Sequence, residues 1–146
     1  MGGPCSPVVL GGRGGPGGED SSVPIPRMTE ALVGLSEIGR RHGLGAVHFG
    51  HAAEGHIHTG LLVKTDDPAE VVEIEAAMRE MHQLALDLDG SVTGEHGIGT
   101  ARIEFMPQEH GPAYDLMATI KRAIDPDNIM NPGKVFSPEV LLRTES

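Results

Sequence analysis

Apolar residues recur three or four positions apart in three stretches of the chain, which is the spacing of one helical face. The first runs from Met28 to Arg41 and is followed by Gly43, a helix-ending residue. The second begins at Asp67-Pro68, and the third covers about 112–124. Three helices are therefore predicted, with these inward positions: Met28, Leu32, Leu35 and Ile38; Val71, Ile74, Met78, Met81, Ala85 and Leu88; Ala113, Met117, Ile120 and Ile124.

Capping and turn-forming residues indicate where these helices end and which elements lie between them. Asp67 is placed to cap the second helix, with Pro68 in its first turn and Glu70 as the reciprocal capping residue. Short strands are predicted at 22–25, 45–50 and 56–63. A short helix is expected at 100–106, a stop at 125–127 and a turn at 131–134. The order strand, helix, strand, strand, helix predicts an α+β fold, with helices on one face of an antiparallel sheet and a helical segment at the C-terminus.

The first 18 residues differ in composition from the rest of the chain. They hold eight Gly and three Pro and show no hydrophobic period. Such a segment buries too little apolar surface to offset its chain entropy. We therefore expect a disordered tail over 1–18 and one ordered domain over 19–146.

Composition narrows the classes of function. The net charge of -10 and the pI near 5.1 argue against a nucleic-acid or anionic-membrane partner. Cys5 is the single cysteine, so the sequence gives no sign of an oxidising compartment. No apolar run approaches the roughly 18–20 residues of a membrane span. The expectation is a cytoplasmic protein without a membrane span.

Histidines and glutamates gather in two glycine-rich segments. His51, His56 and His58 lie in HFGHAAEGHIH, and Glu95 and His96 lie in GSVTGEHGIG. Two imidazoles and a carboxylate form a three-ligand set that holds a divalent metal and leaves a position open. The alternative for any single histidine is a surface residue or a hydrogen-bonded core residue. We interpret His42, His48, His82 and His110 as ordinary surface or boundary residues.

Three motifs in this order, HFGHAAEGHIH, GSVTGEHGIG and IDPDNIMNPGKVF, resemble the C-terminal part of the FAD-linked oxidases of the D-lactate dehydrogenase and glycolate oxidase FAD-subunit type. The resemblance runs from about Glu19 to Phe136. It implies a ferredoxin-like cap domain and oxidation of a D-2-hydroxy acid to the 2-oxo acid. The flavin-binding domain that FAD would mainly require is absent from this chain, so a separate flavin-binding domain or subunit is an expected partner.

The resemblance also implies roles for single residues. His51, His58 and Glu95 correspond to the ligands of a divalent metal, Zn or Mn, and His96 to the base that takes the substrate hydroxyl proton. Asn131 and Lys134 correspond to a segment that returns towards the flavin. The resemblance thus assigns a specific role to each of these residues.

The chain departs from the family pattern at two places. Where GDGN is usual, it has Ala53-Glu54-Gly55-His56, which makes His56 a further candidate for binding metal or substrate. Gly60 stands where relatives that use 2-hydroxyglutarate carry an asparagine, so a smaller acid such as D-lactate or glycolate is favoured. Two alternatives remain open: a stand-alone metal-binding module, and an inactive remnant of a truncated gene.

Overall fold

The computed structural model describes residues 8–9, 18–63 and 68–142. The chain divides into two compact units, Met1–Glu95 and His96–Ser146. The expected disorder of the tail falls mainly on 1–7 and 10–17, which lie outside the described residues. Within that tail, Val8–Val9 and Gly18 belong to strands.

The first unit is built on an antiparallel sheet with β4, His56–Val63, at its centre. Strand β3, Gly45–Phe49, pairs with one edge of β4. The other edge pairs first with β2, Gly18–Ser22, and then with β1, Val8–Val9. His58 is therefore directly opposite both Asp20 and Phe49. Because opposed residues share a face of a sheet, these three side chains lie on the same face.

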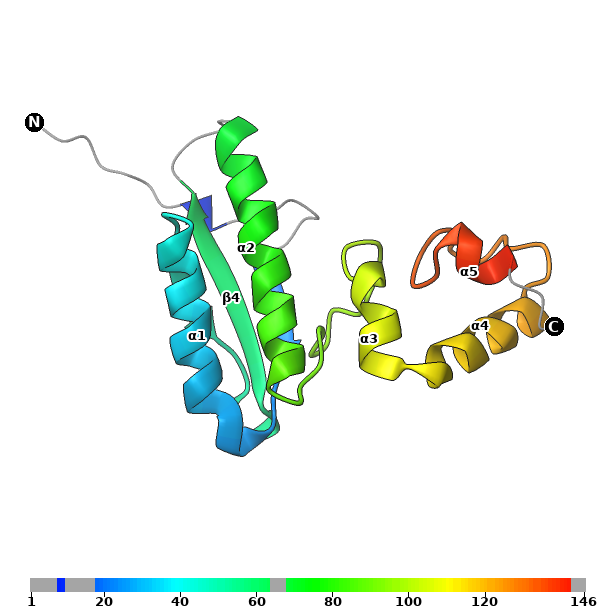
Figure 1. Cartoon of the computed structure of the whole chain (residues 1–146), viewed down its shortest axis with the longest axis horizontal. Coiled ribbons are helices and arrows are strands. Elements are labelled where there is room, and N and C mark those ends of the chain that lie inside the picture. Colours follow the sequence, from blue (N-terminus) through cyan, green and yellow to red (C-terminus); the bar gives the residue numbers. More distant parts are fainter. Residues whose placement is uncertain (1–7, 10–17, 64–67, 143–146) are drawn as a thin grey trace, which may run out of the picture. The chain divides into compact units, whose positions relative to one another are not determined.

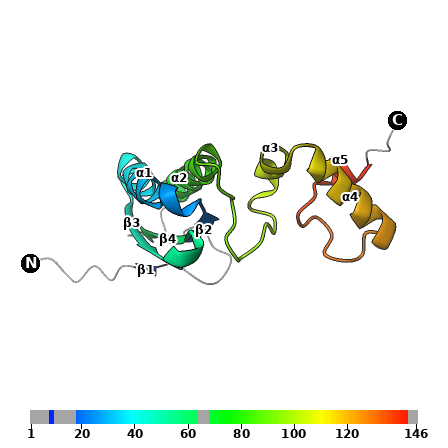
Figure 2. The ribbon, with the colours of Figure 1, turned by 90° about the horizontal axis from the view of Figure 1, so that it is seen from below.

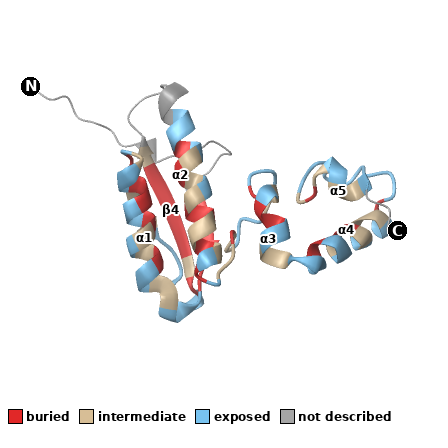
Figure 3. Cartoon of the chain, in the orientation of Figure 1, coloured by how far each residue is buried: buried red, intermediate tan, exposed pale blue. Residues whose placement is uncertain are grey.

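Two helices cover the opposite face of this sheet, as Figure 2 shows. Helix α1, Met28–Arg41, follows the short η1, Ile25–Arg27, and helix α2 spans Pro68–Asp87. Figure 3 shows β4 as an almost continuously buried strand flanked by α1 and α2. The core between helices and sheet is formed by Val23, Ala31, Leu35, Ile38, Leu44, Ile57, Leu61, Ile74, Ala77, Met81, Ala85 and Leu88.

The order β2, α1, β3, β4, α2 confirms the predicted α+β, ferredoxin-like arrangement (Figure 1). The place of a further strand beside β2 is marked by a single antiparallel bridge between Ser22 and Ser91. Helix α1 and strand β4 have the predicted bounds. The predicted capping residue Asp67 lies outside the described residues, and so does the side chain of Glu70.

The first predicted strand was wrong in its position. The sequence indicated 22–25, whereas β2 ends at Ser22 and Ile25 begins η1. Strand β2 contains Glu19 and Asp20, which are buried although carboxylates are disfavoured in strands. Their partners come from distant parts of the chain, so local propensity pointed to the more apolar segment after them.

The second unit is helical within its described residues. It contains η3, Ile103–Phe105, α3, Met106–His110, α4, Pro112–Ile124, and α5, Pro138–Leu142. The helix expected at 100–106 thus begins later and runs further. The core of this unit is formed by Met106, Tyr114, Ala118 and Phe136.

Of the residues predicted on the inward face of α4, only Met117 packs against the core of this unit. Ile120 and Ile124 are 51% and 70% exposed, whereas Tyr114 and Ala118 are buried. Phe136 stacks on Tyr114 with 5.4 Å between ring centroids, and the Tyr114 hydroxyl donates to the Val135 carbonyl at 2.9 Å. This aromatic contact with the following loop decides which face of α4 is covered. Among the described residues, no helix combines the length and apolar character needed to cross a membrane.

Candidate metal centre

Three predicted ligands converge in the first unit. His58 Nε2 lies 3.1 Å from Glu95 Oε1, and His51 Nε2 lies 3.9 Å from the same oxygen. One donor atom from each of the three residues falls within 4.8 Å of the others. The imidazoles of His51 and His58 meet edge to face, with ring centroids 5.9 Å apart.

This spacing fits a small divalent cation. Two donors about 2.1 Å from a tetrahedral ion lie about 3.4 Å apart, and the two distances to Glu95 fall on either side of that value. Imidazole nitrogen and carboxylate oxygen are ligands of Zn²⁺ and of related ions such as Mn²⁺. His58 is buried, whereas His51 and Glu95 are 57% and 47% exposed, so the set has one open side.

A tight turn between β3 and β4 brings His51 beside His58. The turn contains η2, Ala52–Glu54, and closes with the His51 amide donating to the His56 carbonyl at 3.2 Å. Gly55 ends η2 in the left-handed region at φ 76°. A Cβ on Gly55 would stand 2.1 Å from the Val23 carbonyl oxygen, so this position requires glycine.

Asp20, which stands directly behind His58, is not among the site residues predicted from the sequence. Asp20 Oδ1 lies 3.4 Å from His58 Nδ1, and the Asp20 side chain is fully buried. A carboxylate on the second ring nitrogen of a metal-ligating histidine fixes its tautomer and orientation. Asp20 could have been recognised as an acidic residue on the strand that pairs with the ligand-bearing strand β4. It was missed because the first strand was predicted too late in the sequence, at 22–25.

Asp20 also holds the loop that carries Glu95. Its Oδ2 accepts the Thr93 hydroxyl at 3.0 Å and the Gly94 and Glu95 amides at 2.9 Å each. One buried carboxylate thus contacts His58 through one oxygen and holds the GEHG loop through the other. Clustered backbone N–H groups of this kind stabilise a negative charge.

His56 lies next to the ligand set but has another environment. Its ring centroid is 6.0 Å from that of His51, and its Nδ1 is 4.0 Å from Glu54 Oε2. Within the described part of the chain, the grouping of His51, His58 and Glu95 does not include it. A metal or substrate role for His56 remains a prediction.

The remaining predicted site residues lie in the second unit. His96 follows Glu95 directly and is exposed. Asn131 and Lys134 are exposed in the predicted turn, where Asn131 has φ 48° and its carbonyl accepts the Lys134 amide at 3.2 Å. The role of His96 as the base for the hydroxyl proton, and that of Asn131 and Lys134 in a segment facing the flavin, remain predictions.

Three histidines outside the predicted ligand set have defined partners. His42 contacts Glu73 and Glu80 of α2 at 2.8 and 3.0 Å, and these carboxylates raise its pKa above the ordinary 6.5. Burial lowers the pKa of His48, whose ring nitrogens lie within hydrogen-bonding distance of the Thr59 and Ser36 hydroxyls. His82 is buried, not a surface residue, and contacts Glu19.

Comparison with known proteins gives concordant matches over most of the chain. Residues 5–135 match the family described as FAD linked oxidases, C-terminal domain. The chain is 30% identical over 126 residues to the glycolate oxidase subunit GlcD of Bacillus subtilis, which is 86% of this chain and 27% of that protein.

Two other relatives are D-lactate dehydrogenases. The chain is 32% identical to that of Archaeoglobus fulgidus over 80% of this chain and 26% of the relative. It is 33% identical to the mitochondrial D-lactate dehydrogenase [cytochrome] of Arabidopsis thaliana over 83% of this chain and 22% of the relative. The chain therefore spans about a quarter of the length of these relatives.

Proposed function

Because this chain belongs to the FAD linked oxidases and corresponds to their C-terminal domain, we propose that it supplies the metal-binding and substrate-positioning part of an FAD-dependent D-2-hydroxy-acid dehydrogenase. The substrate would be D-lactate or a similarly small acid such as glycolate, converted to the 2-oxo acid. Binding of FAD would depend mainly on the portion of the relatives that this chain does not span.

One observation carries this proposal: His51, His58 and Glu95, from a hairpin and a loop far apart in sequence, direct their donor atoms to one point. These residues would hold Zn²⁺ or Mn²⁺. A bound divalent ion would polarise the substrate hydroxyl and lower its pKa. The Asp20 carboxylate, 3.4 Å from His58 Nδ1, would favour the ring orientation that leaves Nε2 available as a ligand.

The role proposed for His96 is that of the base. A neutral imidazole accepts a proton near pH 7, and this residue adjoins the ligand Glu95 in the chain. Gly60, on the same face of β4 as His58, presents no side chain there, which favours a small acid. Asn131 and Lys134 would act towards the flavin-bearing portion.

A chimeric enzyme tests this function directly. The segment of the Archaeoglobus fulgidus D-lactate dehydrogenase that aligns with this chain would be replaced by residues 19–146, and dye reduction would be followed with D-lactate and glycolate. We expect a flavin-containing, active chimera, with activity lost in His96→Gln and Glu95→Gln. The matched control His110→Gln should remain active. A folded, flavin-loaded chimera without activity on either acid would refute the proposal.

A second candidate function is metal binding alone, since all three ligands lie in the first unit, Met1–Glu95. A metal-binding module would bind Zn²⁺ or Mn²⁺ as the enzyme part does. It would not associate with a flavoprotein. Co-purification of this chain with the separately expressed flavin-binding portion of the same relative distinguishes the two.

A further inference from the structure

We infer that the buried pair of Glu19 and His82 positions the metal centre from the opposite face of the sheet. This inference deepens the proposed function and rests on its metal site. His82 belongs to α2, on the helical face of the sheet. We assign it a positioning role, which it exerts on the ligands through residues of β2.

The two acidic residues of β2 point to opposite faces of the sheet. Glu19 pairs with Thr59, on the face that the helices cover, whereas Asp20 pairs with His58 on the ligand face. Glu19 Oε1 lies 2.8 Å from His82 Nε2, and the two side chains are 0% and 3% exposed. This separation is within hydrogen-bonding distance.

The same Glu19 oxygen is joined to the Asp20 backbone. Glu19 Oε1 accepts the Asp20 amide at 2.9 Å. Two positions further on, the Ser22 amide donates to the Ser91 carbonyl at 3.1 Å, along the outer edge of β2. The edge is therefore fixed by a backbone bridge at Ser22 and by the Glu19 carboxylate at Asp20.

These contacts form one continuous path to the ligands. His82 holds Glu19, Glu19 holds the Asp20 amide, and Asp20 contacts His58 and accepts from the amide of Glu95. A small shift of the Asp20 backbone would move both of its carboxylate oxygens. One oxygen contacts His58 and the other accepts from the loop that carries Glu95, so the shift would displace both ligands together.

A buried pair such as Glu19 and His82 is expected to add little to the free energy of folding. Desolvating two polar groups offsets much of their attraction, and replacing a buried pair as a unit by apolar residues is often neutral or stabilising. Ile74, Ala77, Met81 and Ala85 of the same helix already provide an apolar contact surface. A positional role accounts for a polar pair at this place.

The test compares metal affinity with stability in the full chain, using Zn²⁺ and Mn²⁺ by titration calorimetry and thermal unfolding. His82→Gln retains a donor near the position of Nε2, whereas His82→Met removes it. We expect His82→Met to weaken metal binding by about tenfold or more and His82→Gln to remain near wild type. Ile74→Val, a buried change elsewhere on α2, should lower Tm and leave the affinity unchanged.

The double variant Glu19→Met/His82→Met guards against a simple folding defect, because the pair is replaced as a unit. It should fold and still bind metal about tenfold more weakly. Wild-type affinity in His82→Met or in the double variant would overturn the inference, as would an equal loss in Ile74→Val. If the wild type itself binds no metal, or His51→Ala binds equally well, the proposed site has failed, which is a different result.

Discussion

Asp20 and His58 face each other across the β2–β4 pair, with Asp20 Oδ1 3.4 Å from His58 Nδ1. Phe49, on the other side of β4, packs against the His58 ring with centroids 5.2 Å apart. The imidazole is thus confined between a carboxylate and an aromatic ring. This confinement directs the other nitrogen, Nε2, towards Glu95.

Replacing Asp20 by asparagine should weaken metal binding. The amide keeps the volume but removes the charge that orients His58 and that gathers the Gly94 and Glu95 amides. Loss of such an outer partner typically lowers metal affinity by about 10- to 100-fold. Titration calorimetry with Zn²⁺ measures this change. Asp127→Asn, which alters net charge equally at an exposed position, should bind as wild type does.

Metal should stabilise the folded chain through the three ligands. A ligand that binds only the native state at 100 times its Kd contributes about 2.7 kcal/mol, or roughly 10–20 °C in Tm for a unit of this size. We expect this shift with Zn²⁺ in wild type and in the control His110→Ala. In His51→Ala and His58→Ala it should be lost. An undiminished shift in both ligand variants would place the metal elsewhere.

Gly94 should tolerate no side chain. A Cβ there would stand 2.7 Å from Asp20 Oδ1 and 2.8 Å from His56 Nε2, and the Asp20 carboxylate is held by three hydrogen bonds. Gly94→Ala is therefore expected to reduce metal affinity about tenfold or more by displacing Asp20.

The control for this change lies three residues further on. Gly97 has φ 77°, and a Cβ there meets nothing within 4 Å among the described residues. Gly97→Ala should cost about 1 kcal/mol of stability through backbone strain and leave metal affinity intact. Equal affinity in the two variants would show that the close approach at Gly94 is unimportant.

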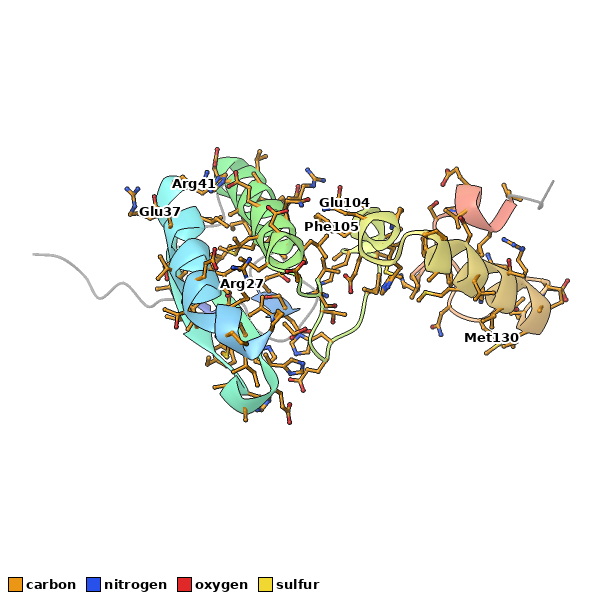
Figure 4. The ribbon with its side chains drawn as sticks, turned by 60° about the horizontal axis from the view of Figure 1, so that its bottom comes forward. Arg27, Glu37, Arg41, Glu104, Phe105 and Met130 are labelled. Carbon is orange, nitrogen blue, oxygen red and sulfur yellow. The ribbon has the colours of Figure 1, made fainter. Side chains whose placement is uncertain are left out.

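Acidic pH should strengthen the contact between α1 and α2 that His42 makes. Glu73 and Glu80 raise the pKa of His42 above 6.5. Arg41, which is labelled in Figure 4, adds a contact to Glu80 at 2.6 Å. Because the folded pKa exceeds the unfolded one, the stabilisation is complete below about pH 6.5. It is lost as pH rises through the raised value.

The corresponding measurement is the free energy of unfolding of wild type and His42→Gln from pH 5 to 9. Glu73 and Glu80 are 56% and 41% exposed, so the difference should be below about 1 kcal/mol and should shrink with added salt. A difference that grows towards alkaline pH would contradict this assignment.

Much of the fold followed from local pattern. The bounds of α1, β4 and α4 were predictable because nearby proline and glycine residues and the periodic apolar residues indicate where these elements begin and end. The face that α4 buries was not, because Tyr114 is covered by Phe136, 22 positions later in the chain. Strand β2 was misplaced because Glu19 and Asp20 look unsuited to a buried strand until their partners are known.

The sequence by itself determined the types of ligand and the two glycine-rich segments in which they lie. The ligand chemistry of imidazole and carboxylate and the backbone freedom of glycine are properties of the residues and do not depend on the fold. Only the tertiary structure decided that Asp20 stands behind His58 and that His82 is buried against Glu19. Those contacts join β2 to β4, to α2 and to the loop before Glu95. Pairings between segments 38 to 75 positions apart depend on strand register and helix packing, which no local pattern specifies.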